Sequence, residues 1–562
     1  MGRKIVRPSS GCFKGVLAVN FIMRNEQTGN RLTDLHTMQF EQVAHLYDGQ
    51  DPYQLETYQK RAKQVAPMFS SLHRDALVDG LLPYLHRIDA SKQTFEQVER
   101  LREKESVAIV TGQQAGLFTG PMYSISKALT VIGLSKSLEA DLGRPVIPVF
   151  WVASEDHDWA EVNHAYVLDH ENEVNRISIS EHAEPHQMVC HTMLTEQAVD
   201  GCLKQIYEVL PEGPYKLSMI TELKAAWRPG DSLSIWFARI MAVLFAHHGL
   251  VIVDPCLPAL RRLVVPVWKR AILGYENVQK ELDIAYRDVI AGGYSPQVIR
   301  DETNTTLFYV DNCKRYVLES TSTDSLRARG LGTEQGLRDW VNLADLDASR
   351  FSSNVLLRPL VQDFLLPTLA YVGGPAEIAY HALAKGVFHA HDRTLPPLVL
   401  RQRITVYPNS VRRIMEHKGL SHDDLAAITE LVPSFLKEHG SSDIERAIAN
   451  KTEELRKEWD DFALKYANLG PQVEEMVNAY VGRAIANTER LKAKMMRILE
   501  QHLSDEVRQL RHVERWLWTD GHPQERRLCP LNIWNKYGQD FVSQMPIHTD
   551  YQNPAPMYHV YL

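Results

Sequence analysis

Several features that mark membrane, secreted and nucleic-acid-binding proteins are missing from this chain of 562 residues. No apolar run reaches the length of about 18 residues that a membrane-spanning helix needs. The apolar stretch GVLAVNFIM near the start is too short and too interrupted for a signal peptide. The formal net charge of −8 argues against general nucleic-acid binding. We therefore expect a cytoplasmic protein that acts on neither membranes nor nucleic acids.

Cysteine is scarce, and no two cysteines form a CxxC pair. The six cysteines are Cys12, Cys190, Cys202, Cys256, Cys313 and Cys529. Such scattered cysteines fit a reducing compartment and argue against a disulfide framework or a zinc site. Most are expected to be small core residues, and Cys256, just after a predicted strand, is the one that we expect near a substrate. The sequence also lacks an HExxH zinc motif and a Walker A phosphate loop.

What the chain does contain is concentrated between residues 107 and 164. The apolar run VAIVT (107–111) predicts a buried strand, and a loop with three glycines and a long helical stretch follow it. A second apolar run (149–153) leads into the charged residues Glu155, Asp156, His157 and Asp158. Strand, glycine loop, helix, strand and charged loop are typical of an open α/β sheet with a site at the carboxyl ends of its strands.

The glycine loop predicts an anion-binding helix start. Pro121 suits the first helical position, which makes Gly120 the expected N-cap. The free N–H groups of the first turn and the helix dipole favour a negatively charged ligand. The alternative is a tight turn without a ligand. The polar residues of the loop favour binding, and we take these as substrate-binding candidates: Gln113, Gln114, Thr119, Gly120, Tyr123 and Lys127.

A similar pattern, a buried strand followed by a glycine-proline helix start, occurs far downstream. The run TLAYV (368–372) predicts another buried strand, and Gly373, Gly374 and Pro375 open a second helix that carries Glu377, Tyr380 and His381 in its first two turns. If both strands belong to one parallel sheet, both helix starts open on one edge. Two positive helix ends suit a phosphate or a substrate with several carboxylates. Gly373, Gly374, Glu377 and Tyr380 are therefore further binding candidates.

The charged cluster after the second strand supplies the catalytic candidates. Three carboxylates around one imidazole are expected to raise the pKa of His157 and to allow general acid–base catalysis by Glu155, Asp156, His157 or Asp158. Two alternatives stay open. The charges can simply cap the next helix at a solvated strand end, or His157, Glu161 and His164 can bind a metal. Metal is the weaker alternative, because the spacing is not HExxH and no cysteine cluster supports it, so we expect no metal.

The rest of the chain predicts several segments around this core. Residues 1–32 form an extra N-terminal segment that we interpret as disordered, or as the result of a start assigned upstream of the true one, for which Met23 and Met38 are the alternatives. A short aromatic tail is expected to return to the core. The segments between are a helical part (33–105), core parts (106–169, 231–279 and 351–440), insertions (170–230 and 280–350), a coiled-coil hairpin (441–518) and the tail (519–562). NTTLFYVDNCKRYVLES in the second insertion predicts a β-hairpin, and residues 398–408 predict a further strand.

The coiled-coil prediction comes from apolar residues at heptad-like spacing. Ile444, Ile448 and Leu455 begin one such series, Gly470-Pro471 breaks it, and Val473 and Val477 resume it. Two long helices joined by a Gly-Pro turn form an antiparallel hairpin that buries its apolar seam on itself or on a second copy, so we expect a homodimer. An ordinary helical bundle packed on the core is the alternative.

Four blocks of the sequence resemble one known family. TGQQAGLFTGPMYSISKA, PVFWVASEDHDWAEVNH, RPLVQDFLLPTLAYVGGPAEIAYH and IWNKYGQDFV are similar, in order and spacing, to the bacillithiol-biosynthesis cysteine-adding enzymes, BshC. The resemblance covers about residue 33 to the C-terminus. It implies an α/β fold: a Rossmann-like parallel-sheet core related to class I aminoacyl-tRNA synthetases, with connecting insertions and a C-terminal α-helical coiled coil that dimerises.

The resemblance also implies a function: a ligase that adds L-cysteine to glucosaminyl-malate in the last step of bacillithiol synthesis. The two carboxylates of the malate part suit the paired helix starts with Lys127 and Arg358, the arginine of the third block. ATP would activate cysteine by analogy with the synthetases, but neither a HIGH nor a KMSKS motif is present. ATP or ADP binding therefore stays open. The alternatives from other classes are a metal-assisted hydrolase of a small anion and a nucleotide-binding scaffold that acts with partner enzymes.

Overall fold

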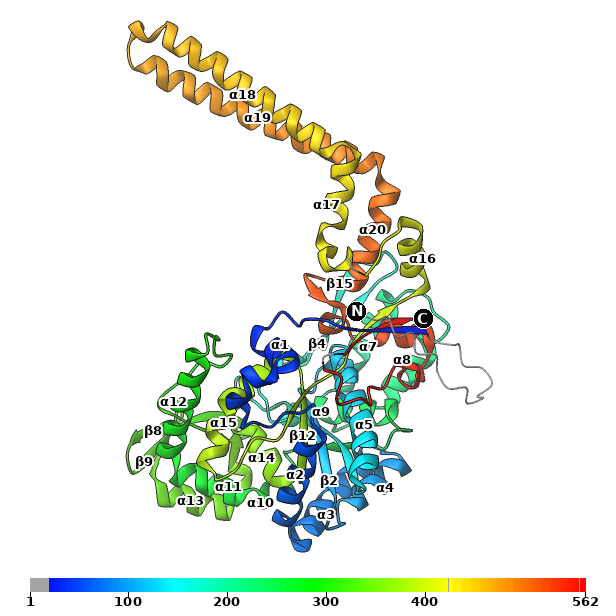
Figure 1. The fold of residues 1–562 in the computed structure, drawn as a ribbon, viewed down its shortest axis with the longest axis vertical. Coiled ribbons are helices and arrows are strands. Elements are labelled where there is room, and N and C mark those ends of the chain that lie inside the picture. Colours follow the sequence, from blue (N-terminus) through cyan, green and yellow to red (C-terminus); the bar gives the residue numbers. More distant parts are fainter. Residues whose placement is uncertain (1–19, 423, 555) are drawn as a thin grey trace. The chain divides into compact units, whose positions relative to one another are not determined.

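The fold divides into two compact units. The computed structural model describes residues 20–422, 424–554 and 556–562. The first unit consists of the described part of Met1–Val406 together with Glu525–Leu562, and the second is Tyr407–Gln524 (Figure 1). The prediction that the core continues to residue 440 is therefore wrong, because the chain enters the second unit at Tyr407, 35 residues before the first long helix begins at Ser442.

A five-stranded parallel sheet forms the centre of the first unit. Its strands lie in the order β13 (Leu398–Leu400), β12 (Thr368–Gly373), β2 (Val107–Gln113), β3 (Val146–Val152) and β6 (Val251–Val253), and all neighbours are parallel. Nearly every residue of these strands is buried. Strands covered on both faces are apolar throughout, which is why they were recognisable as continuous apolar runs. The prediction that 107–111 and 368–372 share one parallel sheet is confirmed.

The connections run in opposite directions from the centre of this sheet. From β2 the chain continues to β3 and β6 on one side, and β12 and β13 extend the sheet on the other side. Such a switch point leaves a crevice beyond the carboxyl ends of the two central strands. The predicted strand at 398–408 is split: its second half is β14 (Arg403–Tyr407), which pairs in a different sheet, of order β1-β17-β14.

Two long helices follow the central strands. α5 (Tyr123–Leu142) comes after β2 and contacts β2 and β3, while α15 (Pro375–Ala390) comes after β12 and contacts β12 and β13. Gly374 is the N-cap of α15, as expected for a Gly-Pro start. The prediction of Gly120 as N-cap of α5 is wrong. Residues Leu117–Thr119 form a short 3-10 turn, and Met122 takes the cap position.

α5 is also more deeply buried than an amphipathic stripe requires. Ile125, Leu129 and Ile132 are buried as predicted, but so are Ser126 and Thr130 on other sides of the helix. The C-terminal tail explains part of this, since a Cβ added at Gly133 of α5 would lie 2.0 Å from the carbonyl oxygen of His548. The tail therefore returns to the core, as expected.

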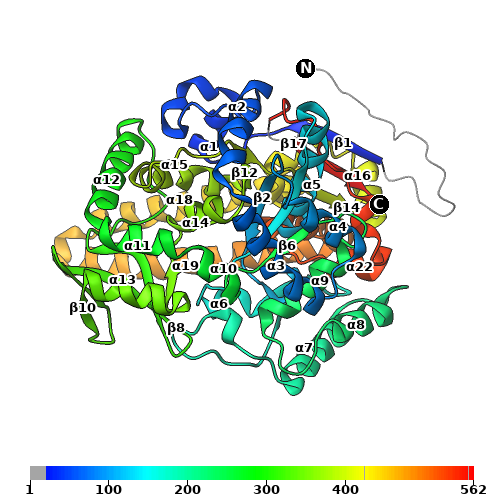
Figure 2. The same ribbon diagram turned by 90° about the horizontal axis from the view of Figure 1, so that it is seen from below.

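Residues 33–105 are helical, as predicted. They contain α1 (Arg31–Met38), α2 (Leu55–Val65), α3 (Ser71–Arg87) and α4 (Lys92–Arg100). α2 contacts β12, and α4 contacts β3 and β6 (Figure 2). The core segments also supply α9 (Leu233–Leu244), α10 (Pro258–Leu263), α11 (Val265–Leu273) and α14 (Arg358–Leu365).

The two chain ends of the first unit are paired with each other. β1 (Asn20–Asn25) runs antiparallel to β17 (Pro556–Tyr561). The interpretation of residues 1–32 as an extra segment is therefore wrong for residues 20–32, and residues 1–19, with Cys12, lie outside the described residues. Between the second unit and β17 the tail forms α21 (Gln524–Arg527), α22 (Leu531–Tyr537) and α23 (Phe541–Gln544).

The insertions have their own secondary structure. The first contains the hairpin β4 (His164–Leu168) and β5 (Val174–Ser178), then α7 (Glu196–Val209) and α8 (Lys216–Ala225). The second is framed by α12 (Tyr275–Ala291) and α13 (Leu337–Leu346). Its antiparallel sheet has the order β10 (Glu334–Gly336), β9 (Ser325–Ala328), β8 (Lys314–Ser322), β7 (Asn304–Asp311) and β11 (Phe351–Ser353). The predicted hairpin is β7–β8 and is confirmed.

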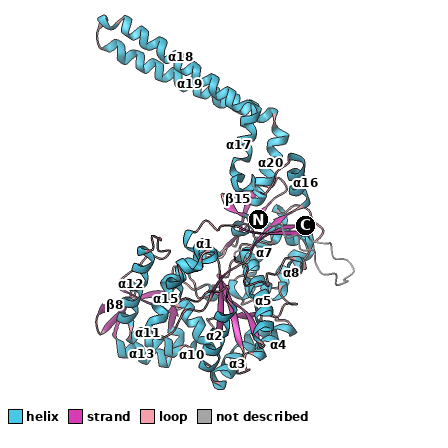
Figure 3. Cartoon of the chain, in the orientation of Figure 1, coloured by secondary structure: helices cyan, strands magenta, loops and turns pink. Residues whose placement is uncertain are grey.

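The second unit is almost entirely helical (Figure 3). α16 (Asn409–Lys418) and α17 (Leu431–Leu436) precede α18 (Ser442–Lys465) and α19 (Gln472–His502), which lie side by side, and α20 (Ser504–Leu517) follows. Gly470 has a φ of +117° in the turn between the long helices, a backbone conformation that favours glycine. The predicted antiparallel hairpin is thus confirmed. Across all described residues, no helix combines the length and the apolar character that a membrane span requires.

Candidate active site

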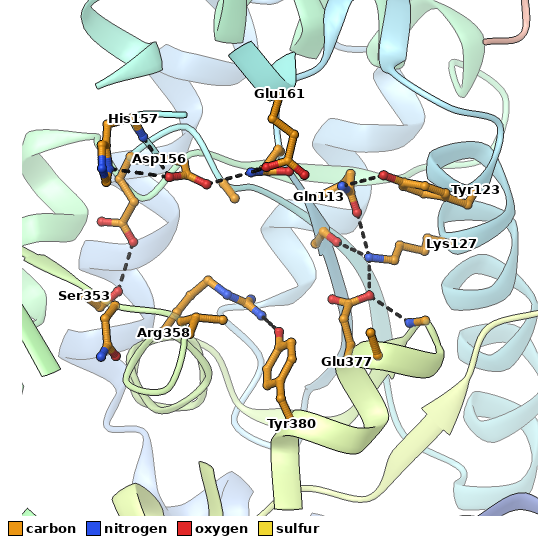
Figure 4. Close-up of a pocket in the computed structure, with 18 of the residues that line it drawn as sticks. Gln113, Tyr123, Lys127, Asp156, His157, Glu161, Ser353, Arg358, Glu377 and Tyr380 are labelled. Atoms are coloured by element: carbon orange, nitrogen blue, oxygen red, sulfur yellow. Dashed lines mark hydrogen bonds and ion pairs between the residues drawn. The ribbon is translucent and has the colours of Figure 1, made fainter. Parts of the chain in front are cut away.

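A cavity of about 620 Å³ opens at the carboxyl ends of β2, β3 and β12, at the switch point of the parallel sheet. This volume is in the range of about 300–1,000 Å³ that is usual for small-molecule sites. Of the residues singled out in the sequence, the following line it: Gln113, Gln114, Tyr123, Lys127, Glu155, Asp156, His157, Arg358, Gly374, Glu377 and Tyr380. Figure 4 labels eight of them around the central space: Gln113, Tyr123, Lys127, Asp156, His157, Arg358, Glu377 and Tyr380. The topology therefore brings most of the predicted site together.

Lys127 and Glu377 form a buried ion pair on one side of the cavity. Lys127 Nζ lies 2.5 Å from Glu377 Oε2 and also donates to Gly112 O and Gln113 Oε1, at 2.7 and 2.9 Å. Three acceptors satisfy the three N–H groups of the ammonium. Burial raises the pKa of Glu377, but Lys127 and hydrogen bonds from Gly374 N–H and Tyr371 Oη outweigh it and lower the pKa to about 2.

This pairing changes the role expected for the two helix starts. Lys127 is compensated by Glu377, and the Gly374 N–H at the start of α15 is occupied by the same carboxylate. On the other helix, Met122 N–H donates to Leu528 O. The expectation of two free positive helix ends is therefore wrong in its simple form, because side chains and the tail already satisfy part of them. Lys127 shapes the cavity and does not stand ready as an isolated carboxylate ligand.

Arg358 is the cation best placed to receive an anion. Its Nη2 donates to Tyr380 Oη at 2.7 Å and lies 3.4 Å from Tyr371 Oη, and its guanidinium faces the Tyr371 ring. Both hydrogen-bond partners are neutral phenols, and burial raises the pKa of Tyr380 to about 12. A guanidinium held by neutral groups beside a cavity can form strong, forked hydrogen bonds to a carboxylate.

The opposite side of the cavity is acidic. Gln114 Nε2 donates to Asp156 Oδ2 and to Glu161 Oε2, both at 2.7 Å, and so holds the two carboxylates together. The pKa of Asp156 is lowered, since the charge of Arg315 and two hydrogen bonds outweigh burial. The pKa of Glu161 is raised by burial and by the neighbouring Asp156 and Asp158. The pKa values of the two neighbouring carboxylates are thus shifted in opposite directions.

His157 does not have the property predicted from its three acidic neighbours. Its pKa is lowered, first by burial and then by the charge of Arg315, and these outweigh Asp156 and Asp158. Arg315 Nη1 lies 3.5 Å from His157 Nδ1 and 3.5 Å from Asp156 Oδ1. The prediction of a raised pKa is wrong, because an arginine from the second insertion reaches the cluster. His157 is a neutral base at neutral pH.

The carboxylates of Glu155 and Asp158 are already bound by other groups of the protein. Glu155 is 5% exposed, and its two oxygens accept from Arg261, Ser352 and Ser353 at 2.8, 2.9 and 3.0 Å. A carboxylate with both oxygens bonded in this way fixes the loop after β3. Asp158 caps the short helix α6 (Trp159–Val162) by accepting from Glu161 N–H. It is exposed and does not line the cavity, so for this residue the capping alternative describes the structure.

Three further binding candidates lie beside the cavity rather than in its lining. Thr119 is fully buried with a φ of +74°, and Gly120 lines a smaller neighbouring pocket of about 230 Å³. Gly373 ends β12, one residue before Gly374 enters the lining. Cys256 is likewise not among the lining residues.

Sequence reasoning missed the contributions of the second insertion. Phe308 and Arg315 of β7 and β8 reach the cavity, and the Arg315 guanidinium stacks on the Phe308 ring at 4.0 Å. Neither residue lies in a glycine loop or at a core strand end, so no local signal marks them. Arg401, just after β13, also lines the cavity, but Glu525 binds it through two hydrogen bonds of 2.7 Å.

The metal alternative has no ligand cluster in the structure. Glu161 and His157 line the large cavity, and His164 lines only the smaller pocket. Within the ranges that the structure describes, no group of three His, Cys, Asp or Glu side chains is arranged to hold a metal ion.

The parallel sheet, its switch-point cavity and the helical hairpin define a Rossmann-like protein with a coiled-coil extension. Residues 18–402 match the N-terminal Rossmann-like domain of the bacillithiol-biosynthesis protein BshC, and residues 404–554 match its C-terminal coiled-coil domain. The chain belongs to the BshC family. The boundary between these two domains agrees with the boundary between the structural units and not with the predicted one at 441.

Curated relatives cover most of the chain. A protein of Salinibacter ruber is 32% identical over 496 residues, which are 86% of this chain and 88% of the relative. A protein of Heliobacterium modesticaldum is 33% identical over 497 residues (87% and 86%), and one of Geobacillus kaustophilus is 32% identical over 479 residues (84% and 88%). All three carry the name "Putative cysteine ligase BshC". The resemblance inferred from the four sequence blocks is confirmed.

Proposed function

We propose that this protein is a ligase that joins the carboxyl group of L-cysteine to the amino group of glucosaminyl-malate, as the last step of bacillithiol synthesis in the cytoplasm. The names of the relatives support a cysteine ligase, and the matched domains support the pathway. The acceptor and the place of the step are the specific content of this proposal.

The main support for the proposal is that one side of the cavity is acidic and the other side presents an arginine. Asp156 and Glu161, joined by Gln114, suit the ammonium group of cysteine. Arg358, held by Tyr380, suits a carboxylate of the malate part. A cavity of about 620 Å³ has room for an amino acid beside a sugar conjugate.

The protonation states give these groups chemical roles. The sugar amine must lose a proton to become a nucleophile, and a new N–C bond then forms at the cysteine carboxyl carbon. Glu161, with its raised pKa, and the neutral His157 are the candidates to accept that proton. Asp156, with its lowered pKa, keeps a negative charge that holds the cysteine ammonium.

ATP is the proposed source of activation for the cysteine carboxylate. Amide formation from a free carboxylate in water needs such activation. ATP would supply it by transferring a phosphoryl or an adenylyl group to the carboxyl oxygen, with release of ADP or pyrophosphate, and the amine would then displace phosphate or AMP. Gln113, Gln114 and Tyr123 line both the cavity and the smaller pocket at the start of α5, and Arg526 lines both as well. These polar and cationic side chains fit a phosphate group. Release of ADP or AMP in step with product would establish ATP as a co-substrate.

The deciding experiment uses the purified full-length protein with cysteine and glucosaminyl-malate, with and without ATP. Liquid chromatography with mass spectrometry should detect the amide product, and His157→Ala should remove it while leaving the circular dichroism spectrum unchanged. Asp158→Ala is the matched control from the same loop and should retain activity. Accumulation of glucosaminyl-malate in a deletion strain, with loss of bacillithiol, should accompany this result. Normal bacillithiol in that strain would overturn the proposal.

We also propose a homodimer through the hairpin of α18 and α19. No residue of α18 is buried, and Leu464, Leu469 and Met476 are 75, 73 and 72% exposed. A second copy would cover such side chains. Light scattering should give twice the mass of the chain, and a variant lacking 441–518 should give the single mass. If that variant keeps its mass and its catalytic activity but loses the association with another protein, the hairpin is a scaffold for a partner enzyme.

A further inference from the structure

Two cysteines from distant parts of the first unit meet behind the candidate active site. Cys190 lies in the 3-10 turn Val189–His191 of the first insertion, and Cys256 lies in the loop after β6. They are 66 residues apart in the sequence, yet both bond to Ser154, and the Cys256 side chain is close enough to raise the pKa of the Cys190 thiol. Both are partly exposed, whereas Cys202 and Cys529 are buried.

Ser154 holds both cysteines from the end of β3. Its carbonyl oxygen accepts from Cys190 N–H at 2.9 Å, and its hydroxyl donates to Cys256 Sγ at 3.3 Å. The same hydroxyl is bonded to the Asp254 carboxylate, which accepts in turn from Cys256 N–H at 2.8 Å. Both backbones are therefore fixed, and the fold holds the two cysteines on either side of Ser154.

The surroundings distinguish the two sulfur atoms. Arg261 Nη2 donates to Cys256 Sγ at 3.7 Å, so a cation faces this sulfur. The hydrogen bond with Cys256 and burial raise the pKa of Cys190. Cys256 is accordingly the first nucleophile and Cys190 the second.

We propose that Cys190 and Cys256 are a modification site that forms a reversible intramolecular disulfide by exchange with low-molecular-weight disulfides. Cys256 Sγ, as the thiolate, attacks one sulfur of the small disulfide, forms a mixed disulfide and releases one small thiolate. Cys190 Sγ then loses its proton, attacks Cys256 Sγ and releases the second small thiolate. Two protein thiols are oxidised to one disulfide, the small disulfide is reduced to two small thiolates, and these take up the two protons that the protein thiols lose.

The bond would act directly on the acidic side of the cavity. A disulfide brings two sulfur atoms to about 2.05 Å, closer than hydrogen-bonded thiols lie, so one of the two segments must shift. The Cys190 turn is bonded to the catalytic candidate loop, since Val189 N–H donates to Asp156 O at 2.8 Å. The Cys256 side leads to Arg261, which binds Glu155 at 2.8 Å. Oxidation therefore displaces the loop that carries Asp156 and His157.

The test is peptide mapping of the full-length protein after exposure to 2-hydroxyethyl disulfide. This probe is neutral, so it has no affinity for a charged substrate cavity. After alkylation of the remaining thiols, mass spectrometry should find the Cys190 and Cys256 peptides joined, with the loss of two hydrogens, and dithiothreitol should separate them. The exposed Cys313 is the internal control for a single thiol, which should carry the probe as a mixed disulfide.

Two variants test the order of attack. Cys190→Ser should retain the probe on Cys256, and Cys256→Ser should leave Cys190 unmodified. Alkylation of both native thiols under conditions in which Cys313 has reacted would overturn the proposal. Hydrogen exchange should show faster exchange at the Val189 and Cys190 amides in the oxidised protein, and unchanged exchange there would refute the coupling to the Asp156 loop. Neither measurement depends on enzyme activity, so a negative result for the disulfide is distinguishable from a negative result for the proposed ligase function.

Discussion

Replacing Lys127 with methionine should show the electrostatic cost of the ion pair that shapes the cavity. In the native protein Lys127 Nζ lies 2.5 Å from Glu377 Oε2, and the side chains are 3 and 19% exposed. Lys127→Met removes the cation but leaves the carboxylate with the Gly374 N–H and Tyr371 hydroxyl as partners. A buried charge that has lost its counter-ion destabilises the folded state.

The magnitude follows from the pKa of Glu377. It falls from 4.5 to about 2, as burial is outweighed by Lys127 and the two hydrogen bonds. At about 1.36 kcal/mol per pKa unit this corresponds to about 3 kcal/mol of folding free energy. Breaking a buried pair costs about 3–5 kcal/mol in general. The shift also contains the two hydrogen bonds that Lys127→Met leaves in place, and burial lowers the pKa of Lys127, which offsets part of the gain from the pair. We therefore expect Lys127→Met to lower the free energy of unfolding by an amount at the lower end of this range, about 3 kcal/mol.

A double-mutant cycle separates the pair from the individual residues. Glu377→Gln alone should also destabilise the protein, and Lys127→Met with Glu377→Gln should cost less than the sum of the two by about 2 kcal/mol. The assay is urea unfolding at pH 7, followed by the fluorescence of the first unit, in which Trp151 and Trp236 are fully buried. Far-ultraviolet circular dichroism follows the helices of both units in the same samples.

The pH dependence supplies an independent check. Because the pKa of Glu377 is lower in the folded state than in the unfolded state, its contribution is present above pH 4.5 and is lost as the pH falls from 4.5 through about 2. The native protein should lose this contribution in that window, and the double variant should not. Additive single effects, or a Lys127→Met variant of native stability with only a raised KM, would refute the ion-pair reasoning and restore Lys127 as a substrate ligand.

Three further changes test the cavity and its support. Arg358→Gln should raise KM for the carboxylate-bearing acceptor about 10- to 100-fold, the loss of roughly 1.5–3 kcal/mol for a hydrogen bond to a charged group, while the unfolding midpoint stays within error; an unchanged KM in steady-state kinetics would refute this role. Glu161→Gln should abolish the acid limb of the rate–pH profile, which in the native enzyme lies above an ordinary carboxyl pKa because the pKa of Glu161 is raised and the base must be ionised; persistence of that limb would assign it to another group. Gly133→Ala should destabilise the first unit by about 1–3 kcal/mol or more, because the added Cβ meets His548 O. Gly201→Ala in α7, with open space around its Cβ, is the control and should be neutral or stabilising by up to about 1 kcal/mol in the same melts.

Much of the core fold was predictable because its signals are local. The runs at 107–111 and 368–372 are apolar without alternation, as strands buried on both faces must be. Gly374-Pro375 marks the start of α15, and Gly470-Pro471 marks the turn between α18 and α19. The predictions were wrong where a segment distant in the sequence determines the local structure. The strand at residues 20–25 forms because β17 pairs with it, more than 500 residues later.

The sequence predicted where the candidate site lies better than it predicted what each side chain does there. Gln113, Asp156 and Tyr380 line the cavity because strand ends of a parallel sheet meet at one edge. Their neighbours in the sequence do not share this place, since Asp158 caps a helix and Glu155 binds Arg261. Short polar stretches do not reveal which side chain points inward.

By itself the sequence determined the parallel-sheet core, the glycine-proline helix starts, the coiled-coil hairpin and the family, because periodicity and short motifs act over a few residues. Only the tertiary structure decided which charges compensate each other. Glu377 meets Lys127 from 250 positions away, and Arg315 reaches His157 from an insertion. A pKa depends on burial and on charges within a few ångströms, whatever their separation along the chain. That dependence is why His157 is neutral where its acidic neighbours in the sequence predicted a charged histidine.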